Sequence, residues 1–444
     1  ISECLVGSEM CIRDSSGICP RKTTARNLLF RRYCPPLTQT GFRTKSASNL
    51  HIRINAENLS KPMKNKNFKF SNTGNAFLVA FATFYVLSLI YEFSFRFTSG
   101  MSGAAAWCQY LINPVAFIGS MLVYAKRKNV DVVSATKLNK KIGLKQIGIL
   151  SLLSVCCIMA FLPVSNIFLD ILSRLGFDMS LNIVDTTASV GAYFLGLLLL
   201  AVLPAFAEEF LMRGVVLNAA SRKRDYSYAI LITAGMFSLM HGNPIQTVHQ
   251  FLLGAVLAYV VLVSKSLWAG IFLHFFNNFL SLTLEYPYEA IMKNTSLGSM
   301  HVGYRYLIWI VAILLGGTLV VYLLKKFTKV SAPKRVEILP DNAEVIDVYE
   351  NKDGVYSTEK TLSVKAQESK NDFAVAFRDL CGIFKKGGLK AAYNKINTII
   401  RDITPEDDEM TEMSREDFFP SNIKLVYVIL AVIWIISLVS GFLN

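Results

Sequence analysis

Five ionisable side chains lie in apolar runs where a lipid-spanning sequence normally carries none. Glu208, Glu209 and Arg213 interrupt one apolar run, and His241 and His274 lie in later ones. A charge at the centre of a bilayer costs about 2.5 to 3.5 kcal/mol by insertion scales, so it persists where it pairs or lines a cavity. We therefore interpret these five residues as candidate functional groups.

The spacing of the two glutamates predicts different roles for them. Glu209 and Arg213 are four residues apart and face each other on a helix. A buried arginine needs a carboxylate partner, so Glu209 is interpreted as the structural counter-ion. Glu208 points about 100° away and is left unpaired, which suits a general base that takes a proton from water. Pro204 removes a backbone hydrogen bond nearby and could open space for that water.

Two histidines and an asparagine form a second set of candidate functional residues. His274 and Asn278 are four residues apart, so both can donate hydrogen bonds to one point, as an oxyanion requires. His241 closes the short apolar run that follows the glutamates. Either histidine alone would be interpreted as a core residue bound to a backbone carbonyl. Because both histidines, Asn278 and Glu208 lie in consecutive apolar runs, a functional site is favoured. His249 and His301 lack such neighbouring functional groups and are predicted to be structural.

The sequence also permits a zinc site at these residues. Glu208, His241 and His274 could bind zinc with a water molecule as fourth ligand. The HExxH arrangement is absent, because no histidine here is followed by glutamate. We favour a glutamate mechanism without metal.

The elements that must position these residues are membrane-spanning helices. The chain is 52% hydrophobic and its mean hydropathy is +0.40. A helix needs about 20 apolar residues to cross a bilayer. The fold class is therefore predicted as all-α, a multi-pass bundle of eight core spans and one C-terminal span. The apolar runs are 76–95, 104–125, 147–169, 190–213, 228–242 (short and ending in a turn signal), 245–263, 267–284, 303–324 and 423–442.

Basic residues predict how the spans are oriented. The linker 126–145 carries seven Lys or Arg against one Asp131, which places it in the cytoplasm by the positive-inside rule. An alternating model then puts the N-terminus inside, Asn444 outside, and the glutamates toward the cytoplasmic end of their helix. The net charge is +14, of which residues 1–62 carry +6 (ten Lys or Arg minus four acids), and the remaining +8 is expected to face anionic lipid at these loops. Nucleic acid binding is not implied.

Composition divides the chain into four parts. Residues 1–62 begin with Ile1 and are predicted to be non-native or disordered, with a basic targeting peptide as the alternative. Residues 63–325 form the membrane core, 326–421 a cytoplasmic polar insert, and 422–444 a final transmembrane helix. Within the insert, 341–372 has the composition of a flexible linker. Two amphipathic helices follow it, lying on the membrane surface or packed together as a hairpin. Their apolar positions are Phe373, Phe377, Leu380, Phe384, Leu389, Ile396, Ile399, Ile400 and Ile403.

Three motifs in order carry a family resemblance. Residues 208–213 match EExxxR, 237–241 match FxxxH, and 274–278 match HxxxN. The chain thus resembles the CAAX protease and bacteriocin-processing (CPBP) family of intramembrane proteases, which includes CAAX prenyl proteases and lysostaphin-resistance proteins. The similarity covers roughly 190–285 and extends less closely over 75–325. The polar insert and the last span are not part of the family core.

The resemblance implies an endopeptidase that cleaves membrane-associated peptides or proteins. Glu208 and His241 would activate water, His274 and Asn278 would stabilise the oxyanion, and Glu209 with Arg213 would hold the helix. A catalytically silent scaffold or bacteriocin-immunity protein of the same fold is the alternative. A transporter would require inverted repeats, which the sequence lacks. A bacterial plasma membrane is the expected location, and a eukaryotic endoplasmic reticulum the alternative.

Overall fold

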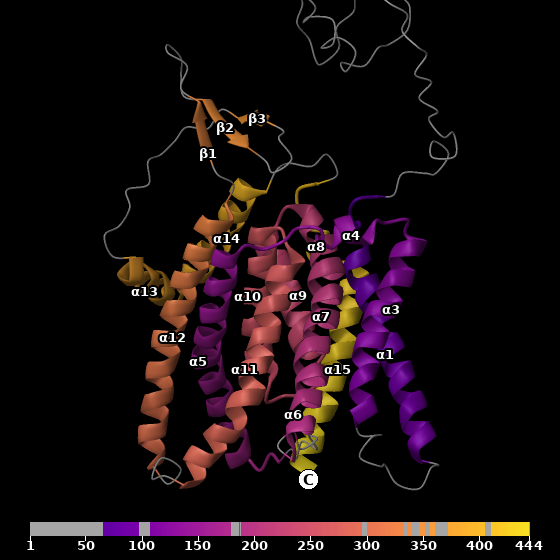
Figure 1. The fold of residues 1–444 in the computed structure, drawn as a ribbon, viewed down its shortest axis with the longest axis vertical. Coiled ribbons are helices and arrows are strands. Elements are labelled where there is room, and N and C mark those ends of the chain that lie inside the picture. The colour runs from indigo at the N-terminus through magenta and orange to yellow at the C-terminus, as the bar shows by residue number, and fades with distance from the viewer. Residues whose placement is uncertain are drawn as a thin grey trace, which may run out of the picture. The chain divides into compact units, whose positions relative to one another are not determined.

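The apolar runs of the sequence are helical wherever the structure describes them, except at the turn residues 240–242 and 245–246 (Figure 1). The structure is a computed structural model that describes residues 65–96, 107–178, 186, 188–294, 300–332, 335–338, 346–350, 356–359, 372–404 and 410–443. The described residues belong to one unit, Met63–Asn444. The predicted tail 1–62 lies outside them.

Long helices dominate the described part of the chain. Seven of them are long and apolar enough to cross a membrane, whereas α3 with 16 residues and α9 with 14 are shorter. The helices of the bundle are α1 (Asn72–Arg96), α3 (Ile112–Arg127), α4 (Val132–Ala135), α5 (Leu144–Arg174), α6 (Val190–Gly196), α7 (Leu203–Glu209), α8 (Leu217–Ala220), α9 (Tyr226–Leu239), α10 (Thr247–Ser264), α11 (Leu267–Asn294), α12 (Val302–Ser331) and α15 (Ser421–Leu443).

The fourth span is one continuous helix with two wider turns. It runs from α6 through α7 to α8, and the segments Leu197–Val202 and Phe210–Val216 between them are π-helical. Short π-helical segments are found frequently at functional sites. The second of these segments directly follows Glu208 and Glu209.

The outer faces of the bundle are apolar. Leu89, Leu307 and Ile436 are 67%, 58% and 63% exposed on α1, α12 and α15. A soluble protein does not leave large apolar surfaces of this kind in water, whereas a bilayer covers them. The chain is thus a multi-pass helical membrane protein, and the predicted all-α fold class is confirmed.

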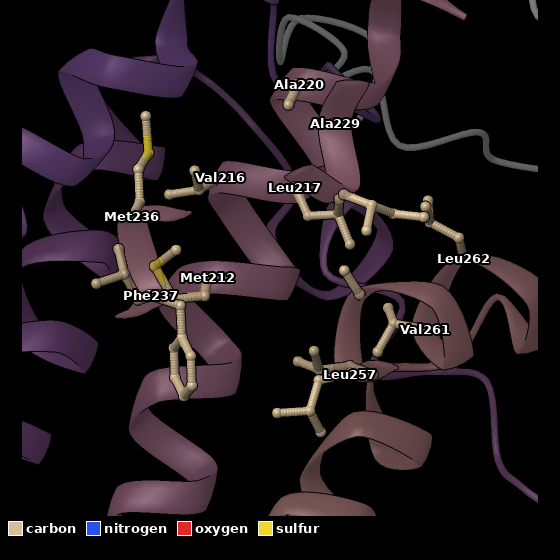
Figure 2. Packing of buried hydrophobic residues seen from close by; sticks show 14 of the residues in the cluster. Met212, Val216, Leu217, Ala220, Ala229, Met236, Phe237, Leu257, Val261 and Leu262 are labelled. Atoms are coloured by element: carbon tan, nitrogen blue, oxygen red, sulfur yellow. The ribbon is translucent and has the colours of Figure 1, made fainter. Parts of the chain in front are cut away.

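The centre of the bundle is packed around the fourth span. Figure 2 shows Met212 and Val216 of that span lying near Met236 and Phe237 of α9, with Leu257 and Val261 of α10 on another side of the same core. Small residues allow the closest approaches. A Cβ atom added at Gly316 of α12 would lie 2.9 Å from the backbone nitrogen of Ala160 in α5.

The basic loops meet at one end of the bundle. Trp268 Nε1 donates to the Leu138 carbonyl at 2.8 Å, and Asn218 Nδ2 donates to the Ala135 carbonyl at 3.0 Å. Burial, together with the charges of Lys265 and Arg222, lowers the pKa of Lys137 to about 8. The loops that the alternating topology assigns to one side are therefore adjacent; which side of the membrane they occupy remains a prediction.

The polar insert contains strands that composition did not predict. The strands β1 (Arg335–Ile338), β2 (Ile346–Glu350) and β3 (Tyr356–Glu359) pair antiparallel in the order β1-β2-β3. Two of them lie inside 341–372, so the linker prediction was wrong there. Short groups of β-branched and aromatic residues, which an averaged composition hides, favour these strands.

Two helices of the insert pack against the bundle. The helix α13 (Asp372–Ile383) lies against α12, and α14 (Gly388–Ile403) lies against α9. Ser227 Oγ donates to the Tyr393 carbonyl at 2.6 Å, which fixes α14 to the start of α9. A cavity of about 490 Å³ lies between these helices, α10 and α12. None of the predicted catalytic residues lines it.

We expect the α5–α12 contact to limit stability. Gly316→Leu should destabilise the protein by about 1 to 3 kcal/mol, because a larger side chain would overpack against Ala160. Gly148→Leu on α5 is the matched control, since a Cβ atom there meets nothing within 4 Å. Thermal unfolding in detergent measures both. Equal melting temperatures for the two variants would contradict the close packing.

Candidate active site

The two adjacent glutamates are buried and point in different directions. Glu208 is 5% exposed and Glu209 is fully buried at the end of α7. Consecutive residues on a helix are about 100° apart, so the two carboxylates have different surroundings.

Glu209 forms the ion pair predicted with Arg213. Arg213 Nη1 donates to Glu209 Oε1 at 2.6 Å, and Arg213 Nη2 donates to the Gly254 carbonyl of α10 at 3.1 Å. The guanidinium also lies 4.4 Å from the centre of the Phe237 ring. A Cβ atom at Gly270 would lie 2.7 Å from Glu209 Oε2, so α11 approaches the carboxylate closely because position 270 is glycine.

The structure gives Glu209 a further partner. His274 Nδ1 lies 3.0 Å from Glu209 Oε1. A carboxylate paired with arginine can only accept hydrogen bonds, so the Nδ1 atom must be the donor. Glu209 therefore orients a candidate catalytic histidine as well as holding its own helix, a role that the spacing alone did not reveal.

Glu208 faces both candidate histidines. Its Oε2 atom lies 3.8 Å from His241 Nε2 and 4.0 Å from His274 Nε2. These distances are too long for direct hydrogen bonds, and they suit a single bridging water molecule. Glu208 Oε2 is buried and has no hydrogen-bond partner among the described residues.

The ring of His241 is fixed through its other nitrogen. His241 Nδ1 lies 2.7 Å from the Phe237 carbonyl, which can only accept, so Nδ1 is the donor. In the neutral ring the Nε2 atom then carries the lone pair. The arrangement is the same in His274, where Nδ1 donates to Glu209. Both rings consequently direct Nε2 toward Glu208.

His241 lies in the turn that follows a helix too short to cross a membrane by itself. The helix α9 has 14 residues and is about 21 Å long, which is shorter than the roughly 30 Å hydrocarbon core. The turn that follows must therefore satisfy its backbone groups inside the protein. Thr247 Oγ1 donates to the Asn243 carbonyl at 2.9 Å, and Ser238 Oγ donates to the Thr247 carbonyl at 2.6 Å.

The last span covers this turn. Trp434 Nε1 of α15 donates to Thr247 Oγ1 at 2.7 Å. Tyr427 Oη of the same helix donates to the Ile232 carbonyl of α9 at 2.8 Å. The ninth span thus braces the segment that carries His241, although it lies outside the three motifs.

Asn278 does not meet His274 at a common point in the structure. Its Nδ2 atom donates to the Leu200 carbonyl at 3.4 Å, at the long end of the hydrogen-bond range. The neighbouring Asn277 is 2% exposed, and its Oδ1 atom has no partner among the described residues. The joint oxyanion role of His274 and Asn278 stays a prediction.

The two histidines predicted to be structural have no described contact with Glu208. The ring of His301 caps α12, where Nδ1 accepts from the Gly303 backbone at 3.2 Å. The ring of His249 lies edge-on to Phe161, with 6.3 Å between their centres. Its Nδ1 atom is buried without a hydrogen-bond partner among the described residues, so the expected bond to a carbonyl is not formed there.

Sequence reasoning missed Asn113. This residue of α3 donates from Nδ2 to Glu208 Oε1 at 2.9 Å. An amide within an apolar run is also a polar group at membrane depth, so the signal that singled out Glu208 was present here too. No spacing rule connects residues 95 positions apart, and the contact required the tertiary structure.

The predicted zinc ligands do not fit a zinc ion as they are placed. Zn–N and Zn–O bonds of about 2.0 to 2.2 Å place two ligands of a tetrahedral ion about 3.4 Å apart. The distances from Glu208 Oε2 to the two Nε2 atoms are longer, at 3.8 and 4.0 Å. Among the described residues, no group of three or more His, Cys, Asp or Glu side chains has metal-binding geometry.

The fold and the site together define a membrane protein with a glutamate and two histidines gathered at membrane depth. Residues 190–280 match the family model described as type II CAAX prenyl endopeptidase, Rce1-like. The resemblance to the CAAX protease family is thereby confirmed for the segment that carries Glu208, His241, His274 and Asn278. No curated protein and no solved structure matches the chain.

The buried ion pair predicts unequal effects of two substitutions. Arg213→Ala should lower stability by about 3 to 5 kcal/mol, because it leaves Glu209 as an uncompensated buried charge. Glu208→Gln should be much milder, since Glu208 has no cationic partner as close as Arg213. Thermal unfolding and yield in detergent measure the difference. A stable but inactive Arg213→Ala would instead place Arg213 in the chemistry.

Proposed function

We propose that this chain is an intramembrane endopeptidase that hydrolyses peptide bonds with water activated by Glu208. The observation that carries the proposal is the convergence of Glu208 Oε2 with the Nε2 atoms of His241 and His274, at 3.8 and 4.0 Å, inside the membrane core. The family match over 190–280 supports the same class of activity.

The geometry supports a specific place for the attacking water. A water molecule between Glu208 and His241 would donate one hydrogen to Glu208 Oε2 and the other to His241 Nε2, since both atoms are acceptors. Its lone pair would then point toward the substrate. As the oxygen bonds to the scissile carbonyl carbon, Glu208 takes one proton. The same proton passes to the leaving nitrogen when the carbon–nitrogen bond breaks.

The oxyanion of this intermediate needs hydrogen-bond donors. His274 can supply one from Nε2 only when its ring also carries a proton there, because Nδ1 is committed to Glu209. Asn278 would have to exchange its long contact with the Leu200 carbonyl for the oxyanion.

The substrate to test first follows from the family description. A prenylated peptide ending in a CAAX sequence has an apolar anchor that partitions into the bilayer, which brings its peptide bond to membrane depth. An unprenylated transmembrane peptide is the second arm of the test. Cleavage of either peptide supports the endopeptidase, and cleavage of the first alone defines the substrate class.

We expect Glu208→Gln to lower hydrolysis by about two to four orders of magnitude, the range for loss of a general base. The protein should remain folded, because the amide keeps the size of the side chain. The rate is measured on purified protein in nanodiscs. Glu416→Gln, at an exposed position, is the control and should retain full activity. If the Glu208→Gln variant kept its biological function without hydrolysis, a scaffold would replace the enzyme.

Removal of metal should leave the rate unchanged. The chain's own groups are sufficient for the proposed mechanism, so protein treated with a chelator and desalted should hydrolyse peptide as before. His274→Gln should then retain part of the activity, since glutamine can donate a hydrogen bond. Stoichiometric zinc in the purified protein, with activity lost to chelator and restored by zinc, would overturn the metal-free mechanism.

A further inference from the structure

The contact between Asn113 and Glu208 lies outside the motifs and the family match. Asn113 is the second residue of α3, and α3 packs against α7, the helix that ends with the two glutamates. Asn113 Nδ2 donates to Glu208 Oε1 at 2.9 Å. The second span therefore contacts Glu208 at Oε1, whereas the two histidines face Oε2.

The two oxygens of Glu208 have different surroundings. Oε1 accepts the hydrogen bond from Asn113, whereas Oε2 is buried without a hydrogen-bond partner among the described residues and faces the two Nε2 atoms. A carboxylate free to rotate about its last bond would exchange these oxygens. The hydrogen bond from Asn113 opposes that rotation, because rotation would break it.

The second polar atom of the Asn113 amide, its oxygen, makes no described hydrogen bond. Asn113 Oδ1 is buried and has no hydrogen-bond partner among the described residues. Native proteins leave few buried polar atoms unsatisfied, and such atoms call for an explanation. An amide placed only to join two helices would be expected to use both ends on protein groups. Here the donor is used on Glu208, and the acceptor has no partner among the described residues.

We propose that Asn113 is a positioning residue for hydrolysis, which holds Glu208 so that Oε2 alone receives the proton of the attacking water. This inference rests on the proposed endopeptidase function. It adds a residue from α3 to a site whose recognised motifs lie on the fourth to seventh spans. Asn113 acts through Glu208 and not on the substrate bond itself.

The first test separates turnover from binding. Asn113→Leu keeps the branched shape of the side chain and removes the donor. We expect kcat to fall about 10- to 100-fold, the range for loss of a partner that orients a catalytic ligand, while KM changes little. Ser120→Ala, on the same helix, is the matched control and should leave both constants unchanged. A higher KM with unchanged kcat would refute the positioning role.

A double substitution tests whether Asn113 acts through Glu208. Adding Asn113→Leu to Glu208→Gln should lower the residual rate no further, because residues that act as a unit are not additive. The same loss in both backgrounds would show that Asn113 works independently, and would overturn the inference. Asn113→Ala serves as a second variant if leucine prevents folding: it removes the donor without adding bulk, and should show the same pattern.

A spectroscopic measurement does not depend on turnover. Infrared difference spectra against Glu208→Gln isolate the carboxylate band of Glu208, and Asn113→Leu should shift that band by removing a hydrogen bond. An unshifted band would refute the contact even if the protein cleaved no peptide. Failure of the parent protein to cleave either peptide, with the band shifted as expected, would instead count against the proposed function alone.

Discussion

The buried ion pair between Arg213 and Glu209 is the constraint on which the rest of the site depends. A guanidinium at membrane depth is tolerated only when its charge is compensated. Glu209, the Gly254 carbonyl and the face of Phe237 meet that need from α7, α10 and α9. Since the same Glu209 oxygen accepts from His274 on α11, one charge pair fixes four spans relative to one another.

This pair also explains why two adjacent glutamates can do different work. Glu209 is held by a cation and a histidine, so its carboxylate is committed to structure and orientation. Each glutamate keeps its Oε2 atom without a hydrogen-bond partner among the described residues, and that of Glu208 faces the Nε2 atoms of His241 and His274. The burial that makes such an atom costly also keeps bulk water away from it. A single water molecule placed between Glu208 and His241 would then be activated in defined geometry, as the proposed hydrolysis requires.

The short helix α9 and the last span α15 form the second structural feature on which the site depends. Because α9 ends within the membrane, the turn with His241 would expose polar backbone to lipid if nothing covered it. Thr247, Ser238 and Trp434 satisfy groups of this turn, and α15 lies beside it. The last span therefore has a physical role at the site, although the family model ends at residue 280.

The sequence alone was enough to predict the membrane class, the helical runs and the ion pair between Glu209 and Arg213. These follow from local quantities: the length of an apolar run, and an i,i+4 spacing that a helix converts directly into a contact. Composition failed for β2 and β3, because pairing between strands depends on partners that an average over the segment ignores. Tertiary structure alone decided that Asn113 reaches Glu208, that His274 binds Glu209 and that Trp434 braces the turn. Each of these contacts joins residues on different helices, and the packing of those helices depends on the shape of the whole core, which no spacing along the chain encodes.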